Sequence, residues 1–381
     1  MKNSKVLAAG YAGIVFFGIS FLTLGSVLPS LRETLHIDMG QASTLAGILP
    51  LGVLAGSLVF GPWCDRYGFK TPFQFSSAIV VLGFLGLASF RTVPLLGTCV
   101  FVIGTGGGIL NGACNALVTD ASEDHRKSTN LSILGVFYGI GALLMPLILG
   151  IFDDVPYSKI LRYMAVFLFL VFVYFSIIRF PEAKVRQGFP VKEGFLLLRQ
   201  PALLLFSFIL FFQSALEGLC SNWIPVFLQD SPAYGLPQQE ALFLLTFMVV
   251  GIAAGRALLS WMSLHYAPWK ILWGYFFLIL AGFAGLYAGI NPVISLILIG
   301  TGLGATFPVI LSYVGKRYKS LSGTAIGIAM VIALGGNTLL NYLVGFLPIR
   351  VFPLYLLIIW GFMTLLYLFM SLKGKIENVK K

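Results

Sequence analysis

The chain has 381 residues, of which 58% are hydrophobic and only 10% are charged, and its mean hydropathy is +0.93. A water-soluble chain of this length needs far more charge to cover its surface, so the composition excludes an ordinary soluble protein. The net charge of +11 would suggest nucleic-acid binding in a soluble protein. In a membrane protein, an excess of Lys and Arg is instead a signal of topology.

Twelve apolar runs are long enough to cross a bilayer as helices, which takes ~20 residues each. The first run is too long for a signal-peptide core and lacks a convincing cleavage site, so we expect a span there. In the first half the expected spans are 6–31, 43–64, 72–90, 94–119, 129–152 and 160–180. In the second half they are 201–228, 238–263, 269–289, 292–315, 322–347 and 352–372.

The longest polar break, residues 181–200, lies midway along the chain. It predicts an N-terminal six-helix bundle (1–180), a cytoplasmic linker (181–200) and a C-terminal six-helix bundle (201–381). With the N-terminus inside, the inner loops and ends hold 19 of the 25 Lys and Arg residues and the outer loops hold five. This asymmetry predicts that both termini are cytoplasmic.

Glycine motifs repeat between the halves at nearly one spacing. Ile103-Gly-Thr-Gly-Gly-Gly108 matches Ile299-Gly-Thr-Gly-Leu-Gly304 at an offset of 196 residues, as Gly139 matches Gly335. Gly52 and Gly56 match Gly251 and Gly255 at an offset of 199. Close helix packing explains such glycines better than nucleotide binding does, because they lie inside spans. The pattern predicts two parallel six-helix repeats, an all-α membrane fold.

The loop between the second and third spans reads Gly61-Pro-Trp-Cys-Asp-Arg-Tyr-Gly-Phe-Lys70. This sequence resembles the signature loop of the major facilitator superfamily, and it stands in the corresponding place. The resemblance implies a gating latch on the cytoplasmic side, in which Asp65 lies near the start of the eleventh span. Arg66 and Lys70 would pair with Asp120, at the inner end of the fourth span. These residues would otherwise serve only as topology and turn residues.

A looser resemblance is to the fucose–galactose–glucose:proton symporters. It is carried by Leu110-Asn-Gly-Ala-Cys-Asn115, by Phe137-Tyr-Gly-Ile-Gly141 and by Asn222-Trp-Ile-Pro225. The resemblance implies proton-coupled sugar uptake. The fucose permease uses acids in its first and fourth spans, where this chain has none, so the roles of those acids do not carry over.

Glu217 is the only carboxylate well inside an expected span, and Gln213 lies one turn earlier on the same face. Ionisable groups inside a membrane are functional candidates, and low polarity favours the neutral form of a carboxyl. We therefore expect Glu217 to carry the coupling proton and to bind substrate together with Gln213. The alternative is a structural glutamate that ties helices together.

The remaining candidates for substrate binding are amides and aromatic residues inside the spans. They are Asn111, Asn115, Tyr138, Asn222, Trp223, Asn337 and Asn341. Amides inside spans also hold helices together, and that reading stays open for them. Arg256 would extend towards the membrane surface, bind helix carbonyls, pair with Glu217 or contact an anionic substrate.

The sequence therefore predicts a secondary transporter of the cytoplasmic membrane, a proton-driven symporter of a sugar or similar small polar solute, functional as a monomer. Alternatives are an efflux antiporter for drugs or metabolites, an organic-anion carrier and, less favoured, a non-transporting membrane receptor. We expect no enzyme activity, no nucleic-acid partner, no cofactor and no metal, because the sequence has neither a catalytic constellation nor a metal-ligand set.

The charge asymmetry makes the topology testable. A protease site or epitope tag placed within residues 181–200 should be reached only after cells are permeabilised, because the basic loops stay in the cytoplasm. A tag placed at Arg350, in an expected outer loop, is the matched control and should be reached on intact cells. Cleavage of the 181–200 tag from outside intact cells would contradict the predicted orientation.

Overall fold

The structure is a computed structural model that describes residues 2–123, 127–152, 154–181, 197, 199–263, 265–318 and 322–372. Every element in these ranges is helical, and twelve of the helices are long and apolar enough to cross a membrane. The predicted all-α fold of twelve membrane helices is therefore confirmed. Most of the expected linker, including residues 182–196, lies outside the described residues.

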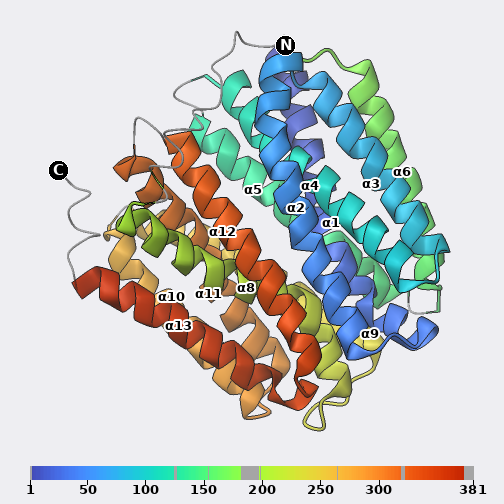
Figure 1. Ribbon diagram of the computed structural model, residues 1–381, viewed down its shortest axis with the longest axis vertical. Helices are drawn as coiled ribbons and strands as arrows, with labels where there is room; N and C mark the ends of the chain where they lie inside the picture. Colours follow the sequence, from blue (N-terminus) through green and yellow to red (C-terminus); the bar gives the residue numbers. More distant parts are fainter. Residues whose placement is uncertain are drawn as a thin grey trace. The chain divides into compact units, whose positions relative to one another are not determined.

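The chain divides into two compact units, Met1–Phe189 and Pro190–Lys381, and Figure 1 traces the helices of each in sequence colours. The first unit contains α1 (Lys2–Leu35), α2 (Met39–Tyr67), α3 (Lys70–Ser89), α4 (Val93–Ala121), α5 (Lys127–Ile151) and α6 (Tyr157–Ile177). The second contains α8 (Pro201–Asp230), α9 (Gln238–Met262), α10 (Pro268–Tyr287), α11 (Pro292–Arg317), α12 (Ser322–Leu343) and α13 (Phe352–Leu372). Two 3₁₀ turns, Val344–Phe346 and Ile349–Val351, join α12 to α13.

Local chemistry explains where several helices begin. Proline stands in the first turn of α4, α8, α10 and α11, where its missing N–H costs no hydrogen bond. Asp38 caps α2 by accepting from the Gln41 N–H at 2.8 Å, and the Asp38 N–H donates to the Gln41 side chain at 3.1 Å. This reciprocal capping box fixes the chain as it turns between α1 and α2.

Helices pack in the same order within each unit. In the first unit α2 packs along α4, α1 along α5, and α3 against both α4 and α6. In the second, α9 packs along α11, α8 along α12, and α10 against both α11 and α13. Each helix therefore has a counterpart in the other unit, which confirms the two six-helix repeats.

The repeated glycines explain the tightest of these contacts. A Cβ atom built on Gly52 of α2 would lie 3.1 Å from the Gly104 Cα of α4. A Cβ atom on Gly251 of α9 would lie 3.1 Å from the Gly300 Cα of α11. Few real Cβ atoms make contacts this short, and the carbonyl oxygens of Phe101 and Ile297 would lie closer still, so only glycine permits these crossings. The packing role expected for the glycine motifs is confirmed. Gly139 and Gly335, in contrast, face open space.

Candidate functional site

The signature loop between α2 and α3 is a tight turn at Gly68. The φ angle of Gly68 is 72°, a backbone conformation that L-residues with side chains rarely adopt, and its N–H donates to the Cys64 carbonyl at 2.9 Å. The turn reverses the chain, and α3 begins at Lys70. Glycine at this position of the signature loop therefore permits the tight turn between the two helices.

The latch residues are only partly placed by the structure. Arg66 is exposed, with its guanidinium carbon 5.2 Å from the Tyr67 ring centroid. Lys70 and Asp120 are also exposed, at the start of α3 and the end of α4. The side chain of Asp65 lies outside the described residues. The latch therefore stays a prediction.

In the first unit, the two amides of α4 share one face, as the spacing of four residues predicts. The Asn115 side-chain N–H₂ donates to the Asn111 backbone carbonyl at 2.8 Å and to the Asn111 side-chain oxygen at 3.2 Å. Tyr138 of α5 stacks on Phe17 of α1, with ring centroids 5.6 Å apart. Asn115 is exposed on the unit, whereas Asn111 and Tyr138 are half-buried.

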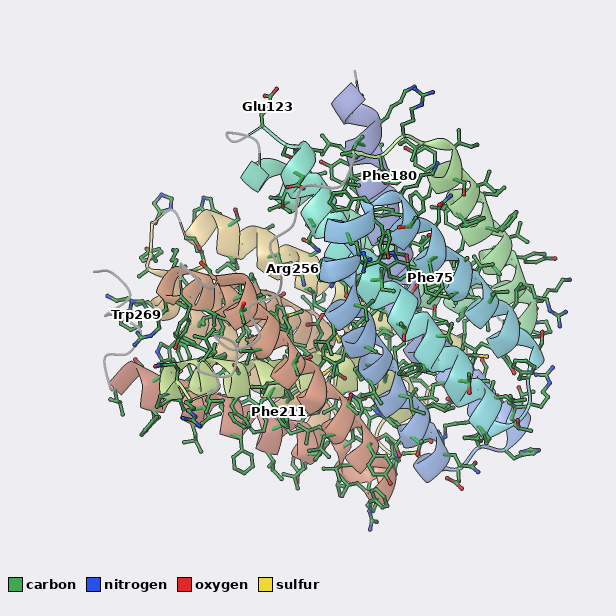
Figure 2. All side chains as sticks on the ribbon, turned by 45° about the horizontal axis from the view of Figure 1, so that its top comes forward. Phe75, Glu123, Phe180, Phe211, Arg256 and Trp269 are labelled. Carbon is green, nitrogen blue, oxygen red and sulfur yellow. The ribbon has the colours of Figure 1, made fainter. Side chains whose placement is uncertain are left out.

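In the second unit, Glu217 lies near the middle of α8 and is half-buried between fully buried neighbours. Arg256 of α9, labelled in Figure 2, is close enough for its charge to interact with the Glu217 carboxyl. One turn before Glu217, the buried Gln213 donates through Nε2 to the Leu303 carbonyl of α11 at 2.9 Å. An acid, a cation and an amide from α8 and α9 thus gather at the level where α8 meets α11.

A second polar cluster ties α8 to α12. The Asn341 side-chain oxygen accepts from the Asn222 amide and from the Trp223 indole N–H, both at 3.1 Å. The Asn341 side-chain N–H₂ donates to the Asn337 side-chain oxygen at 2.7 Å. The Asn337 amide in turn donates to the Ser214 hydroxyl at 3.4 Å. We call these five residues the amide network; all are buried.

Gly218 makes room for this network. A Cβ atom at Gly218 would lie 2.6 Å from the Asn337 Nδ2 atom, so any larger residue would displace the amide. Because the four predicted binding residues of the network already bond one another, the geometry favours the interhelical role for them. Their contact with substrate stays a prediction.

Sequence reasoning did not identify Ser214 or Thr306. Ser214 is recognisable only once Asn337 is known to face it. Thr306 of α11 is buried, and its hydroxyl has no hydrogen-bond partner among the described residues, which is also true of the Gln213 Oε1 atom. Thr306 follows Leu303, the partner of Gln213, by three residues. A water molecule or a substrate hydroxyl would satisfy such atoms.

The family model of the Major Facilitator Superfamily matches residues 10–340. The chain belongs to this superfamily. A relative over nearly the whole length is the glucose/mannose transporter GlcP of Bacillus subtilis, which is 23% identical over 356 residues that cover 88% of this chain and 86% of the relative. The major facilitator chain is thus a transporter in an integral membrane fold and not an enzyme.

Solved structures of transporters share the fold. The chain is similar to a mutant of the nucleoside transporter NupG, with a TM-score of 0.79, 14% identity and full coverage of both chains. It is also similar to the D-xylose-proton symporter, with a TM-score of 0.77, 15% identity and 97% coverage of each chain. At such identities the likeness establishes the major facilitator fold alone.

The amide network predicts a large stability difference between two asparagines. Asn341→Ala should destabilise the protein, because Asn222, Trp223 and Asn337 each lose a buried partner at ~1–3 kcal/mol per group. Asn115→Ala is the matched control and should leave the melting temperature nearly unchanged, because the Asn115 side chain bonds Asn111 of its own helix. Thermal unfolding in detergent measures both. If Asn341→Ala instead melted at the same temperature as the unmodified protein but lost uptake, Asn341 would bind substrate directly.

Proposed function

We propose that this transporter is a proton-coupled symporter that imports a sugar or similar small polar solute. The observation that carries the proposal is the position of Glu217, near the middle of α8, within the electrostatic reach of Arg256. Among the described helices, no other carboxylate lies so far from a span end. The similarity to a glucose/mannose transporter supports the sugar class, and the fold shared with a D-xylose-proton symporter is compatible with proton coupling.

Glu217 has the chemistry that coupling needs. A carboxyl in a poorly hydrated span is less costly when it is neutral, so it takes up a proton when the site is loaded. When the proton leaves, the carboxylate is stabilised by the positive charge of Arg256. The group therefore has a suitable environment in both protonation states. Its partly exposed side chain is open to a solute, whereas the amide network is buried.

Two buried polar groups, one on α8 and one on α11, keep hydrogen-bonding capacity to spare. The Gln213 Oε1 atom accepts hydrogen bonds, and the Thr306 hydroxyl both donates and accepts them. Neither has a partner in the described part of the chain. Both residues are buried, so an ordered water molecule would pair with these atoms, and we place solute recognition at the partly exposed Glu217 beside Gln213.

Alternating access would come from the two bundles, as in other repeat-built transporters. In this proposal Asp65, Arg66, Lys70 and Asp120 stabilise the state that is closed to the cytoplasm. We place both termini in the cytoplasm and the protein in the cytoplasmic membrane, as a functional monomer, on the strength of the charge asymmetry and the fold.

Arg256 supports a second candidate function, carriage of an organic anion. A guanidinium inside a membrane is costly unless a negative charge is near it, and an anionic solute would supply one as the Glu217 carboxylate does. Efflux of drugs or metabolites rests on weaker ground, because only the series Gly135, Gly139, Gly141, Pro146 and Gly150 partly resembles the antiporter motif of drug exporters. An uptake assay with sugars and with organic anions distinguishes the two substrate classes.

The coupling role predicts a selective defect in Glu217→Gln. Glutamine keeps the shape of the side chain and part of its hydrogen bonding but cannot carry a proton. Uphill uptake into proteoliposomes should therefore fall to background, while exchange of labelled solute between equilibrated compartments continues. Glu240→Gln is the matched control, because Glu240 is exposed in the first turn of α9, and it should keep both activities.

Three results for Glu217→Gln distinguish the roles of this residue. Loss of uptake with retained exchange supports coupling. Loss of both activities in a folded protein indicates substrate binding alone. Uphill accumulation by a well-folded variant rules out the coupling role.

The latch predicts a shift in conformational balance for Asp65→Asn. Removing the charge should weaken the state that is closed to the cytoplasm, slow transport and leave solute binding detectable. Cross-linking between cysteines introduced at the two membrane faces reports the balance. Lys70→Gln tests the pairing with Asp120 in the same way. An unchanged balance in Asp65→Asn would show that Asp65 is only a topology and turn residue.

A further inference from the structure

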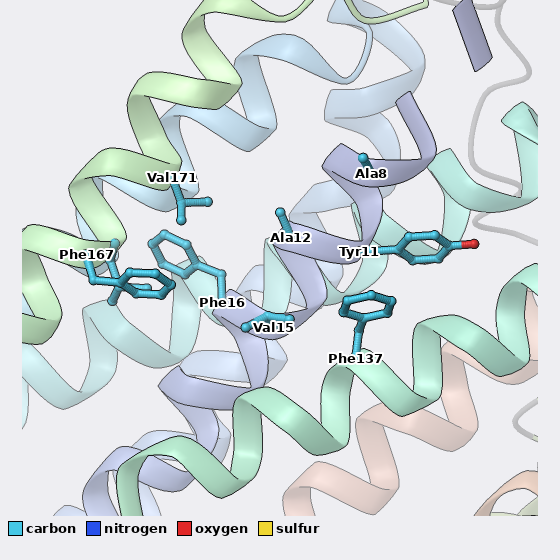
Figure 3. Close-up of a pocket in the computed structure, with 9 residues that line it drawn as sticks. Ala8, Tyr11, Ala12, Val15, Phe16, Phe137, Phe167 and Val171 are labelled. Carbon is cyan, nitrogen blue, oxygen red and sulfur yellow. The ribbon is translucent and has the colours of Figure 1, made fainter. Parts of the chain in front are cut away.

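The first unit contains an apolar groove of about 330 Å³ between α1, α5 and α6. In Figure 3, Tyr11 lies over Phe137 on one side of the groove, and Phe16, Phe167 and Val171 lie on the other. The small side chain of Ala12 lies between these two groups. The Tyr11 and Phe137 rings stack with centroids 5.0 Å apart, which makes this wall rigid.

The groove borders a helix surface suited to lipid. The exposed side chains of α6 include Val166 and Leu170, which are 59% and 61% exposed. Phe167, in the groove wall, is also exposed. A membrane helix that presents such a surface faces hydrocarbon and not water. The groove is therefore open to the acyl chains of the bilayer.

The length of the groove matches one leaflet. Its α1 residues run from Ala8 to Phe16, a stretch that rises about 12 Å along the helix. Half of the hydrocarbon core of a bilayer is about 15 Å thick. An acyl chain that enters from the near membrane surface therefore follows the groove for most of one leaflet.

Two cations stand at the surface end of the groove. Lys5 precedes Ala8 by one turn of α1 and is exposed, and Arg179, also exposed, follows the end of α6. The Tyr174 hydroxyl of α6 donates to the Lys5 carbonyl at 3.3 Å, which brings the two helix ends together. Phe180, labelled in Figure 2, packs on Phe73 at 4.9 Å and holds the segment that carries Arg179.

We propose that this groove binds an anionic phospholipid, with one acyl chain between α1, α5 and α6 and the headgroup phosphate at Lys5 and Arg179. Basic residues between helices at a membrane surface favour anionic headgroups, and the apolar walls bind the chain. A bound lipid fills the space that the small Ala12 side chain leaves and supports the packing of α6 on α1. The site does not depend on which solute the protein carries.

Photolabelling of the full chain tests this site. The protein is reconstituted in phosphatidylcholine vesicles that contain a phosphatidylglycerol with a photoreactive acyl chain, or the same photoreactive chain on phosphatidylcholine. Labelled peptides are identified by mass spectrometry. We expect the phosphatidylglycerol probe to label the groove peptides of α1 and α6 roughly thirtyfold more than the phosphatidylcholine probe, as two basic residues at the headgroup imply.

Paired variants separate the headgroup from the chain. Lys5→Gln combined with Arg179→Gln should remove the preference for phosphatidylglycerol, whereas Arg162→Gln, at the other end of α6, should keep it. Ala12→Phe should fill the groove and reduce labelling by both probes. Val166→Phe adds bulk on the exposed face of α6 and should leave the labelling unchanged.

Two outcomes would overturn the proposal. Equal labelling by both probes in the unmodified protein would show that the groove takes any acyl chain without recognising charge. Groove labelling that survives Ala12→Phe in a folded protein would show that the acyl chain binds elsewhere. Melting temperatures of all variants, measured in the same vesicles, identify any variant that fails to fold.

Discussion

The hydrocarbon core of a bilayer offers no hydrogen-bond partner, and this constraint governs the whole chain. Each backbone N–H and C=O must be satisfied within the span, which leaves helices as the only solution for these twelve segments. Lipid also gives no hydrophobic force for holding helices together, so association depends on close packing and on internal polar contacts. The first unit relies mainly on close packing, and the second adds the amide network.

Close packing is visible where glycines of neighbouring helices meet. Gly56 of α2 faces the Thr105 backbone of α4, and Gly255 of α9 faces the Thr301 backbone of α11. The same contact therefore recurs in both units with the same residue types. A substitution that adds a side chain at Gly255 would push α9 from α11, and Arg256 would move with it. The position of the charged site thus depends on a packing contact beside it.

Much of this arrangement is predictable from the sequence because glycine spacing and hydropathy report directly on packing and on lipid contact. The twelve spans, the repeats and the turn at Gly68 all follow from such local patterns. The partners inside the second unit do not. Asn341 bonds Asn222 and Trp223 from more than a hundred residues away, and no spacing rule specifies a partner at that distance. The sequence predicted polar groups at the right depth but not which of them bond one another.

The two repeats differ in chemistry at one pair of equivalent helix crossings. In the first unit Gly18 of α1 lies against the backbone of α5, where a built Cβ would be 3.0 Å from the Gly141 carbonyl carbon. In the second, Gly218 of α8 lies against Asn337, which stands 196 residues after Gly141, the offset of the repeated glycine motif. Glycine on α5 thus corresponds to an amide on α12. The residues that precede the two glycines differ as well. Gly18 follows the aromatic Phe17, whereas Gly218 follows the acid Glu217. The two units therefore share their helix crossings but differ in polarity at this one, where the second unit has an acid and an amide in place of Phe17 and Gly141.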